Sequence, residues 1–146
     1  MQLQIASIPY TVIPVTVMAA PPAIPDGDSV RLRAENRDMW PSGVRFSRSN
    51  GSVQIRAEGI DALELHFFGR HQPLRWAEKA RDFLLNSLGV DQPDRDHPKA
   101  WALTRSVDTY GRPITFVVPG SVKLEAGAQL AIGSSDLRDA VIDSVN

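Results

Sequence analysis

The chain has 146 residues, 42% of them hydrophobic and 23% charged, which is enough for one folded domain with its own core. Its 16 basic and 17 acidic residues give a net charge of −1. This balance excludes a domain that coats nucleic acid by bulk positive charge, but it leaves a local basic site open. The absence of cysteine excludes disulfides, cysteine-ligated zinc, iron–sulfur clusters and thiol nucleophiles.

The first predicted element is a strand over residues 10–18, which are rich in Val, Ile and Thr, and residues 1–9 are expected to form an N-terminal tail. Pro14 inside this segment indicates an edge strand or a strand start. The apolar stretch over residues 1–23 has no basic start and is interrupted by Pro9 and Pro14. We therefore expect neither a signal peptide nor a membrane span. A cytoplasmic location is favoured, with secretion left open.

Two further strands and a long connection follow. The turn residues Asp26-Gly27-Asp28 precede residues 29–33, whose alternation predicts a half-buried strand. Residues 35–52 are polar and broken by proline and glycine, which indicates a long hairpin or loop insertion. The next strand is expected over residues 52–59. Six basic and two acidic residues between Arg31 and Arg56 give this part of the chain a local charge of +4.

The second half of the chain contains the clearest helical pattern. Apolar residues recur at three- and four-residue spacing over residues 74–88, between Pro73 and Gly89, and predict a helix there. We expect Trp76 in this helix, and Trp101 in a later strand, to pack in the core.

Further strands are expected over residues 100–107 and 114–118, joined by a tight connection at residues 108–112. A weak strand over residues 129–132 and a C-terminal helix from Asp136 complete the order. Strands around one central helix predict a mainly β (α+β) fold, a five-stranded OB-fold barrel that forms a single domain over residues 1–146.

Carboxylates and arginines lie close to the ends of the predicted strands. Asp28 follows the first turn, and Asp61 and Glu64 follow the strand that ends near residue 60. Hard divalent cations prefer oxygen ligands, so Asp28 and Asp61 are candidate metal ligands, and Glu64 is a candidate for activating a water molecule. Arg56 and Arg112 would complete a clamp for a phosphoryl group. Spacing alone leaves the alternative that these are turn, cap and surface residues.

Four motifs stand in order along the chain, namely Asp26-Gly27-Asp28-Ser29-Val30, Arg56 to Glu64, Ala77-Glu78-Lys79-Ala80-Arg81-Asp82-Phe83, and Asp108-Thr109-Tyr110-Gly111-Arg112. Together they resemble the staphylococcal nuclease (thermonuclease) family of OB-fold domains. That family has an Asp-Gly-Asp-Thr-Val turn, an Arg-to-Asp-x-Pro-Glu segment, a Glu-Ala-x-x-Phe helix and a Tyr-Gly-Arg hairpin. The resemblance extends from about residue 12 to the end of the chain.

The resemblance implies a calcium-dependent nuclease that hydrolyses phosphodiester bonds of DNA and RNA, with single strands preferred. By the family pattern, Asp28, Asp61 and the backbone carbonyl of Ala62 would ligate the calcium ion (Ca2+). Glu64 would activate the attacking water. The remaining roles would fall to Arg56 and Arg112, which hold the phosphate, and to Tyr110, which contacts the substrate.

The chain also departs from the family. Leu63 stands where the family usually has proline, and Thr109 stands where a basic residue is common. The loop at residues 35–52 is longer than in compact members, and we expect the family's further C-terminal helices to be missing from this sequence. Either the sequence is a fragment, or the barrel is completed differently, for example in a homodimer or by a swapped element.

Two other functions compete with the nuclease. The first is a catalytically silent OB-fold module that binds nucleic acid or protein through a basic groove and exposed aromatic residues, for which the candidates are Trp40, Phe46, Phe67, Phe68 and Tyr110. The second is a zinc enzyme that uses His66, His71 and His97. The spacing of these histidines matches no metal-ligand motif, so we interpret them as surface or hydrogen-bonded groups.

Overall fold

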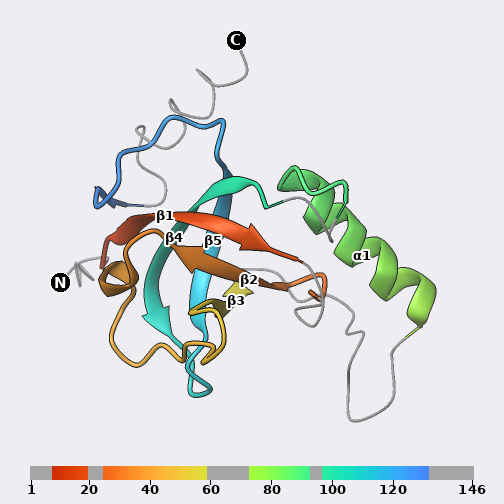
Figure 1. Cartoon of the computed structure of the whole chain (residues 1–146), viewed down its shortest axis with the longest axis horizontal. Coiled ribbons are helices and arrows are strands. Elements are labelled where there is room, and N and C mark those ends of the chain that lie inside the picture. The colour runs from red at the N-terminus through yellow and green to blue at the C-terminus, as the bar shows by residue number, and fades with distance from the viewer. Residues whose placement is uncertain (1–7, 20–24, 59–72, 93–96, 132–146) are drawn as a thin grey trace, which may run out of the picture.

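The computed structural model describes residues 8–19, 25–58, 73–92 and 97–131 (Figure 1). The elements, in chain order, are β1 (Tyr10–Met18), β2 (Ser29–Ala34), the short 3-10 helix η1 (Arg37–Met39), β3 (Val53–Ala57), α1 (Leu74–Ser87), β4 (Lys99–Val107), β5 (Pro113–Pro119) and β6 (Gln129–Leu130). The predicted strands and the predicted helix are confirmed to within a few residues. The expected C-terminal helix lies outside the described residues.

Five strands close into a barrel. The strands follow the order β2-β3-β5-β4-β1-β6, and β1 also pairs with β2, so the sheet formed by β1–β5 closes on itself. The pairing of β3 with β5 is parallel, and the other pairings in the sheet are antiparallel. The predicted mainly β fold, a five-stranded mixed barrel with one helix, is therefore confirmed and is compatible with an OB fold.

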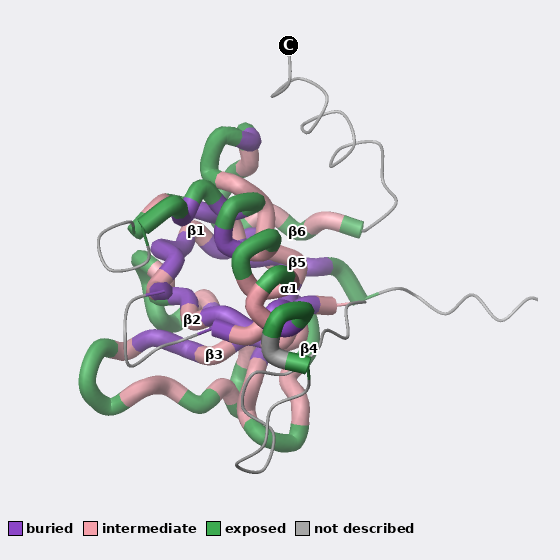
Figure 2. Tube along the Cα trace, turned by 90° about the vertical axis from the view of Figure 1, so that its right-hand side faces the viewer, coloured by how far each residue is buried: buried purple, intermediate pink, exposed green. Residues whose placement is uncertain are grey.

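Strands β2 and β3 alternate buried residues with more exposed ones, as a sheet with one face on the core requires. Val30 and Leu32 of β2 and Val53 and Ile55 of β3 are at most 1% exposed, while the residues between them lie on the outer side. These side chains belong to a large cluster that also includes residues of β1 and β4. In Figure 2 the buried residues accordingly concentrate on the strands rather than on the connections.

The expectation that Pro14 marks an edge strand or a strand start is wrong, because β1 pairs with β2, β4 and β6. Pairing with β6 ends at Thr11, and pairing with β2 begins at Val15. The carbonyl of Pro14 accepts a hydrogen bond from Glu35 N on the β2 side, at 3.1 Å. Within a strand the N–H and C=O of one residue point to the same side. The proline nitrogen therefore lies on the side of β1 between its pairing with β6 and its pairing with β2. No backbone N–H is needed there to pair with a neighbouring strand.

Helix α1 joins the main core cluster at its C-terminal end. Leu85 and the C-cap residue Leu88 are each 4% exposed and belong to this cluster. Trp76 and Phe83 are 57% and 76% exposed, so the expectation that Trp76 packs in the core is wrong. At 3.6 residues per turn, Trp76 lies about 100° away from the direction of Ala77, which is 0% exposed, so Trp76 does not share the buried side of the helix. Among the described residues, no helix is both long and apolar enough to cross a lipid bilayer.

The other two tryptophans lie on or in the barrel. Trp101 packs against a second core cluster, formed by Tyr10, Val12 and Leu103, and its indole nitrogen donates to Val122 O at 2.9 Å, which confirms its packing role. Trp40 is 6% exposed and belongs to the main core cluster. Trp40 is therefore not available as an exposed stacking surface, contrary to the expectation for it.

Candidate functional site

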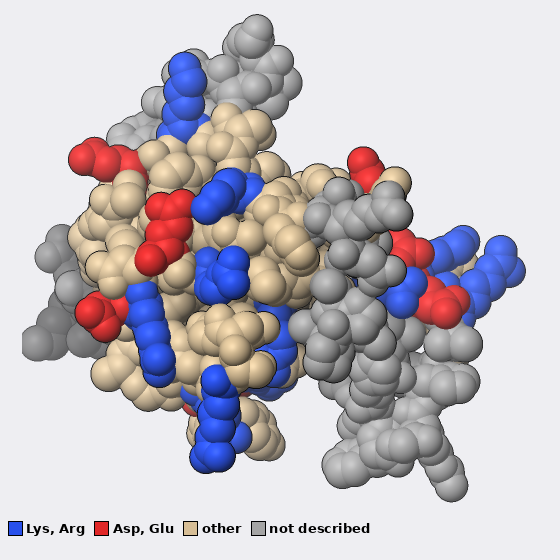
Figure 3. All heavy atoms as spheres, in the orientation of Figure 1, with Lys and Arg blue, Asp and Glu red and all other residues tan. Residues whose placement is uncertain are grey.

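One outer face of the barrel collects the basic residues of β2 and β3. The register pairs Ser29 with Arg56 and Arg31 with Gln54, so these residues share the side opposite to the core residues of the same strands. Figure 3 shows more basic than acidic side chains over β2, β3 and the loop that joins them. The local positive charge expected from the sequence therefore becomes one surface.

Strand β5 brings the second predicted arginine to this face. Arg56 is paired with Ile114 across the parallel β3–β5 contact. Arg112 precedes Ile114 by two residues, and its side chain lines a pocket together with Arg31 and Gln54. The topology thus brings Arg56 and Arg112 to one face of the barrel, although 55 residues separate them in the sequence.

Asp28 lies directly beside Arg56. Its carboxylate Oδ2 is 3.7 Å from the Arg56 guanidinium, and the aspartate side chain is 6% exposed. The Asp28 carbonyl accepts a hydrogen bond from Ala57 N at 2.7 Å, which joins the turn before β2 to the end of β3. Asp26 and Ser29 close that turn with two backbone hydrogen bonds of 3.1 and 3.4 Å. Asp28 is therefore held in a fixed, nearly buried position next to one predicted phosphate ligand.

The turn between β4 and β5 is organised by Asp108, which the sequence did not single out as functional. Asp108 Oδ1 accepts hydrogen bonds from the backbone nitrogens of Tyr110 and Arg112 at 2.9 and 2.8 Å. Its Oδ2 accepts from Arg112 Nε at 2.7 Å. An Asx-type turn of this kind is signalled by aspartate two residues before its donor, so the Asp-x-Tyr spacing carried a usable signal. Asp108 is thus a positioning residue for Arg112.

The electrostatics of Asp108 follow from these contacts. Burial alone would raise its pKa, but hydrogen bonds from the backbone and side chain of Arg112 and from the backbone of Tyr110 outweigh burial. The pKa of Asp108 is therefore held below its usual value of 3.8. A lowered carboxyl pKa stabilises the fold at pH values above the unfolded-state pKa, and this stabilisation is lost as the pH falls through the folded-state pKa.

Replacing Asp108 by Asn is expected to lower the free energy of unfolding at neutral pH by about 1.5–3 kcal/mol, the typical value of hydrogen bonds to a charged group. The difference from the parent chain should shrink as the pH falls below about 4, where the parent carboxylate also becomes protonated. Urea unfolding of both chains at a series of pH values measures this effect. If the difference in the free energy of unfolding between the two chains stays constant down to about pH 2–3, the charge of Asp108 does not contribute to stability.

The pocket on this face has a volume of about 320 Å³. It is lined by Arg31, Arg45, Phe46, Ser47, Gln54, Tyr110, Gly111 and Arg112. Tyr110 is 70% exposed, and the Arg112 guanidinium lies 5.4 Å from the centre of its ring. The predicted substrate residues Tyr110 and Arg112 therefore share one pocket with Phe46, which the sequence named as a candidate aromatic residue, and with Arg45 and Ser47, which it did not assign.

A different polar cluster lies where β3 ends. The Tyr10 hydroxyl donates to the carboxylate of Glu58, with both oxygens at 2.7 Å, and Arg105 lies 3.6 Å from the same group. Burial, followed by the contact with Glu58, raises the pKa of Tyr10. Tyr10 and Arg105 thereby fix the last described residue before the segment 59–72.

Three predicted site residues, Asp61, Ala62 and Glu64, lie in segment 59–72, outside the described residues, as do Phe67 and Phe68. Within the described part of the chain, no group of three or more His, Asp or Glu residues is arranged to hold a metal ion. Asp28 is therefore the one expected metal ligand whose position the structure gives. Its nearly buried carboxylate is the type of donor that calcium prefers.

Comparison of the chain with models of known protein families gives no match, and neither does comparison with curated proteins. The resemblance to staphylococcal nuclease therefore depends on the four sequence motifs and on a barrel of compatible topology.

Proposed function

We propose that the protein is a calcium-dependent nuclease that hydrolyses phosphodiester bonds in single-stranded DNA or RNA. The observation that carries this proposal is the meeting of Asp28 and Arg56, at 3.7 Å, on the face where Arg112 and Tyr110 line a basic pocket. A nearly buried carboxylate beside guanidinium groups is suited to a cation and a phosphate at adjacent positions.

The arginines would bind and orient the phosphodiester. Arg56 and Arg112 each offer a planar fork of N–H donors that matches phosphate oxygens, and their charges oppose the negative charge that grows during displacement. Asp108 fixes the Arg112 guanidinium through a hydrogen bond from Nε at 2.7 Å, and Arg112 lines the pocket. Such fixed donors reduce the reorganisation needed to reach the transition state.

The carboxylates would divide into metal ligands and a base. Asp28 and Asp61, with the carbonyl of Ala62, would hold calcium, which supplies positive charge near the phosphate when bound. Glu64 would accept the proton of the water whose oxygen forms a bond to phosphorus, while one ester oxygen leaves and is then protonated from solvent. Hydrolysis therefore balances with water as the sole co-reactant.

The test is cleavage of a fluorescently labelled single-stranded oligonucleotide, analysed on denaturing gels, with calcium chloride or with EDTA. We expect cleavage in calcium and none in EDTA. Asp28→Asn should remove the cleavage, which distinguishes the protein from a contaminating nuclease. Binding of the oligonucleotide without cleavage in calcium would overturn the proposal and would favour the silent binding module instead.

A further inference from the structure

The connection between β2 and β3 builds one wall of the pocket beside Arg112. It contains η1 and reaches the β4–β5 turn, where Arg45 N donates a hydrogen bond to Gly111 O at 2.8 Å. Gly111 has φ +81°, and a Cβ at this position would lie 2.9 Å from the Cβ of Arg45. Only glycine combines this backbone conformation with so close an approach. The loop and the turn are therefore docked by their backbones.

Further contacts fix the loop itself. Phe46 forms an isolated β-bridge with Val53, and the guanidinium of Arg37 stacks on the Phe46 ring at 3.9 Å. Ser47 N donates to Ser52 O at 2.7 Å, which closes the loop behind the bridge. The pocket wall is thus built in advance, so a ligand would not have to order it.

The charges in the pocket are unbalanced. Arg112 is paired with Asp108 at 2.7 Å. Within the described residues, Arg31 and Arg45 form no ion pair, and Arg31 makes a hydrogen bond of 3.5 Å with Ser52 Oγ. Guanidinium groups that surround one pocket repel each other, and an anion in the pocket would relieve this repulsion. Arginine is also the side chain whose geometry best fits phosphate oxygens.

The remaining lining residues indicate more than a free phosphate ion. A volume of about 320 Å³ is within the range of small-molecule sites, which begins at about 300 Å³. Tyr110, which is 70% exposed, supplies an aromatic surface, and stacking on such a ring requires bases that are not paired in a duplex. Gln54, which also lines the pocket, is two residues from Arg56 on the same face of β3. The pocket is therefore adjacent to the proposed cleavage site.

We infer that Arg31 and Arg45 form a second phosphate subsite, which binds the phosphate of a nucleotide next to the cleaved bond in single-stranded nucleic acid. This inference rests on the proposed function for the identity of the ligand, but binding at the subsite requires neither calcium nor cleavage. The loop at residues 35–52 thus serves to extend the substrate surface beyond Arg56 and Arg112.

The test is equilibrium binding of a short fluorescein-labelled oligothymidylate in EDTA, followed by anisotropy at a series of KCl concentrations. Arg45→Ala and Arg31→Ala should each weaken binding by about 5–10-fold. Each should also reduce the slope of log K against log [KCl] by about 0.7, the value for one phosphate contact on a single strand. Arg45→Ala keeps the backbone hydrogen bond to Gly111, so the loop should remain docked.

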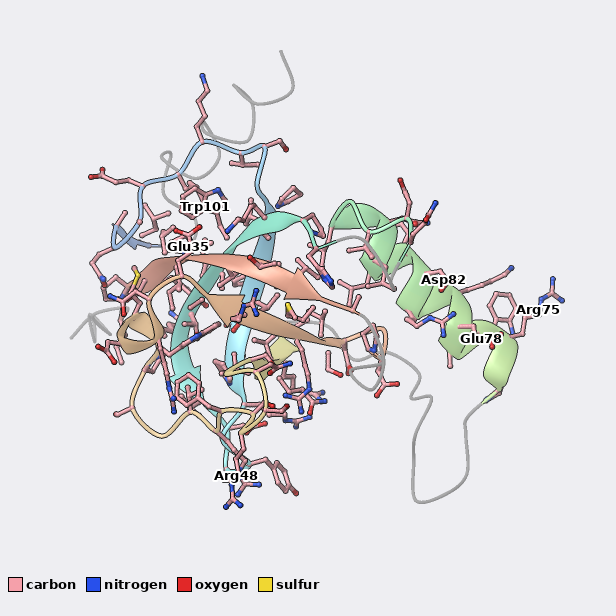
Figure 4. The ribbon with its side chains drawn as sticks, viewed as in Figure 1. Glu35, Arg48, Arg75, Glu78, Asp82 and Trp101 are labelled. Atoms are coloured by element: carbon pink, nitrogen blue, oxygen red, sulfur yellow. The ribbon has the colours of Figure 1, made fainter. Side chains whose placement is uncertain are left out.

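Arg75→Ala is the matched control, because it removes the same charge from the exposed surface of α1, which Figure 4 places away from Arg48 and the loop. Its salt slope should equal that of the parent chain. The subsite is overturned if Arg45→Ala, with an unchanged melting temperature, has the affinity and slope of Arg75→Ala.

An assay of calcium-dependent cleavage distinguishes failure of the subsite from failure of the nuclease proposal. Cleavage with no slope difference removes the subsite alone, whereas a slope difference without cleavage removes the nuclease alone.

Discussion

Replacing Arg56 by Ala should lower calcium-dependent cleavage of single-stranded DNA by about 10³-fold or more, the range for arginines that stabilise phosphoryl transfer. Arg56 lies beside Asp28 and, through the β3–β5 pairing, on the face that carries Arg112. Its loss removes a positive charge and a planar donor fork from the position where charge develops. Single-turnover cleavage rates, with the substrate bound in advance, measure this effect on the chemical step.

The structure offers controls for this substitution. Arg56 is 32% exposed, but the side chain of its partner Asp28 is only 6% exposed, so Arg56→Ala should also lower the melting temperature, and the cleavage rate is compared at a temperature where both chains are folded. Arg56→Lys should recover a small part of the rate, because lysine keeps the charge but not the fork. Arg33→Ala removes an exposed arginine of β2 that does not line the pocket and should leave the rate unchanged. Cleavage by Arg56→Ala within tenfold of the parent rate would exclude the phosphate role of Arg56.

Replacing Leu103 by Ala should lower the free energy of unfolding by about 2–5 kcal/mol, because it deletes a fully buried side chain and leaves a cavity. Leu103 of β4 has 0% exposure and packs with Tyr10 and Val12 of β1 in the second core cluster. For a chain of this size the melting temperature should fall by about 10 °C. Calorimetry or thermal circular dichroism measures the shift.

Ile8→Ala is the matched control for the core, because Ile8 is 68% exposed and only its carbonyl accepts a hydrogen bond from Arg105. Its melting temperature should stay within about 1 °C of that of the parent chain. An equal shift in both variants would show that the second cluster does not contribute the stability that its burial implies.

The strands could be predicted from the sequence because alternation is a local property. Val30 and Leu32 alternate with Ser29 and Arg31, and no knowledge of the rest of the chain is needed to assign a half-buried strand to them. The local pattern does not give the partners of a strand. For this reason the sequence predicts an edge strand or a strand start at Pro14. In the structure Pro14 lies inside β1, between the part that pairs with β6 and the part that pairs with β2.

Trp76 and Trp40 show that burial, too, cannot be predicted from the local pattern alone: Trp76 is exposed where burial was expected, and Trp40 is buried where exposure was expected. Helical spacing places Trp76 near an apolar stripe, but the side of α1 that becomes buried depends on how the helix is oriented in the folded chain, and Ala77 is buried whereas Trp76 is not. Trp40 lies in a polar loop, yet it is buried because that loop folds back onto the main core. In both cases tertiary packing overrides the local pattern.

The candidate site was predicted in part for a related reason. Asp28, Arg56 and Arg112 could be named from motifs, because each motif is short and continuous in the sequence. Arg31, Arg45 and Gln54 could not be assigned to the pocket, because they meet only after β2 pairs with β3 and the loop docks on the β4–β5 turn. Asp108 lies within one of the motifs, but its role in positioning Arg112 depends on hydrogen bonds that form only in the folded turn.

The backbone attachment of the loop has a consequence for how this protein can change. Because Arg45 N and Gly111 O hold the loop in place, the architecture of the pocket wall is independent of which side chain residue 45 carries. Residue 45 is exposed and can be replaced by most amino acids without loss of core packing. If residue 45 binds a substrate phosphate as proposed, its preference is open to selection, natural or in the laboratory, while position 111 is confined to glycine.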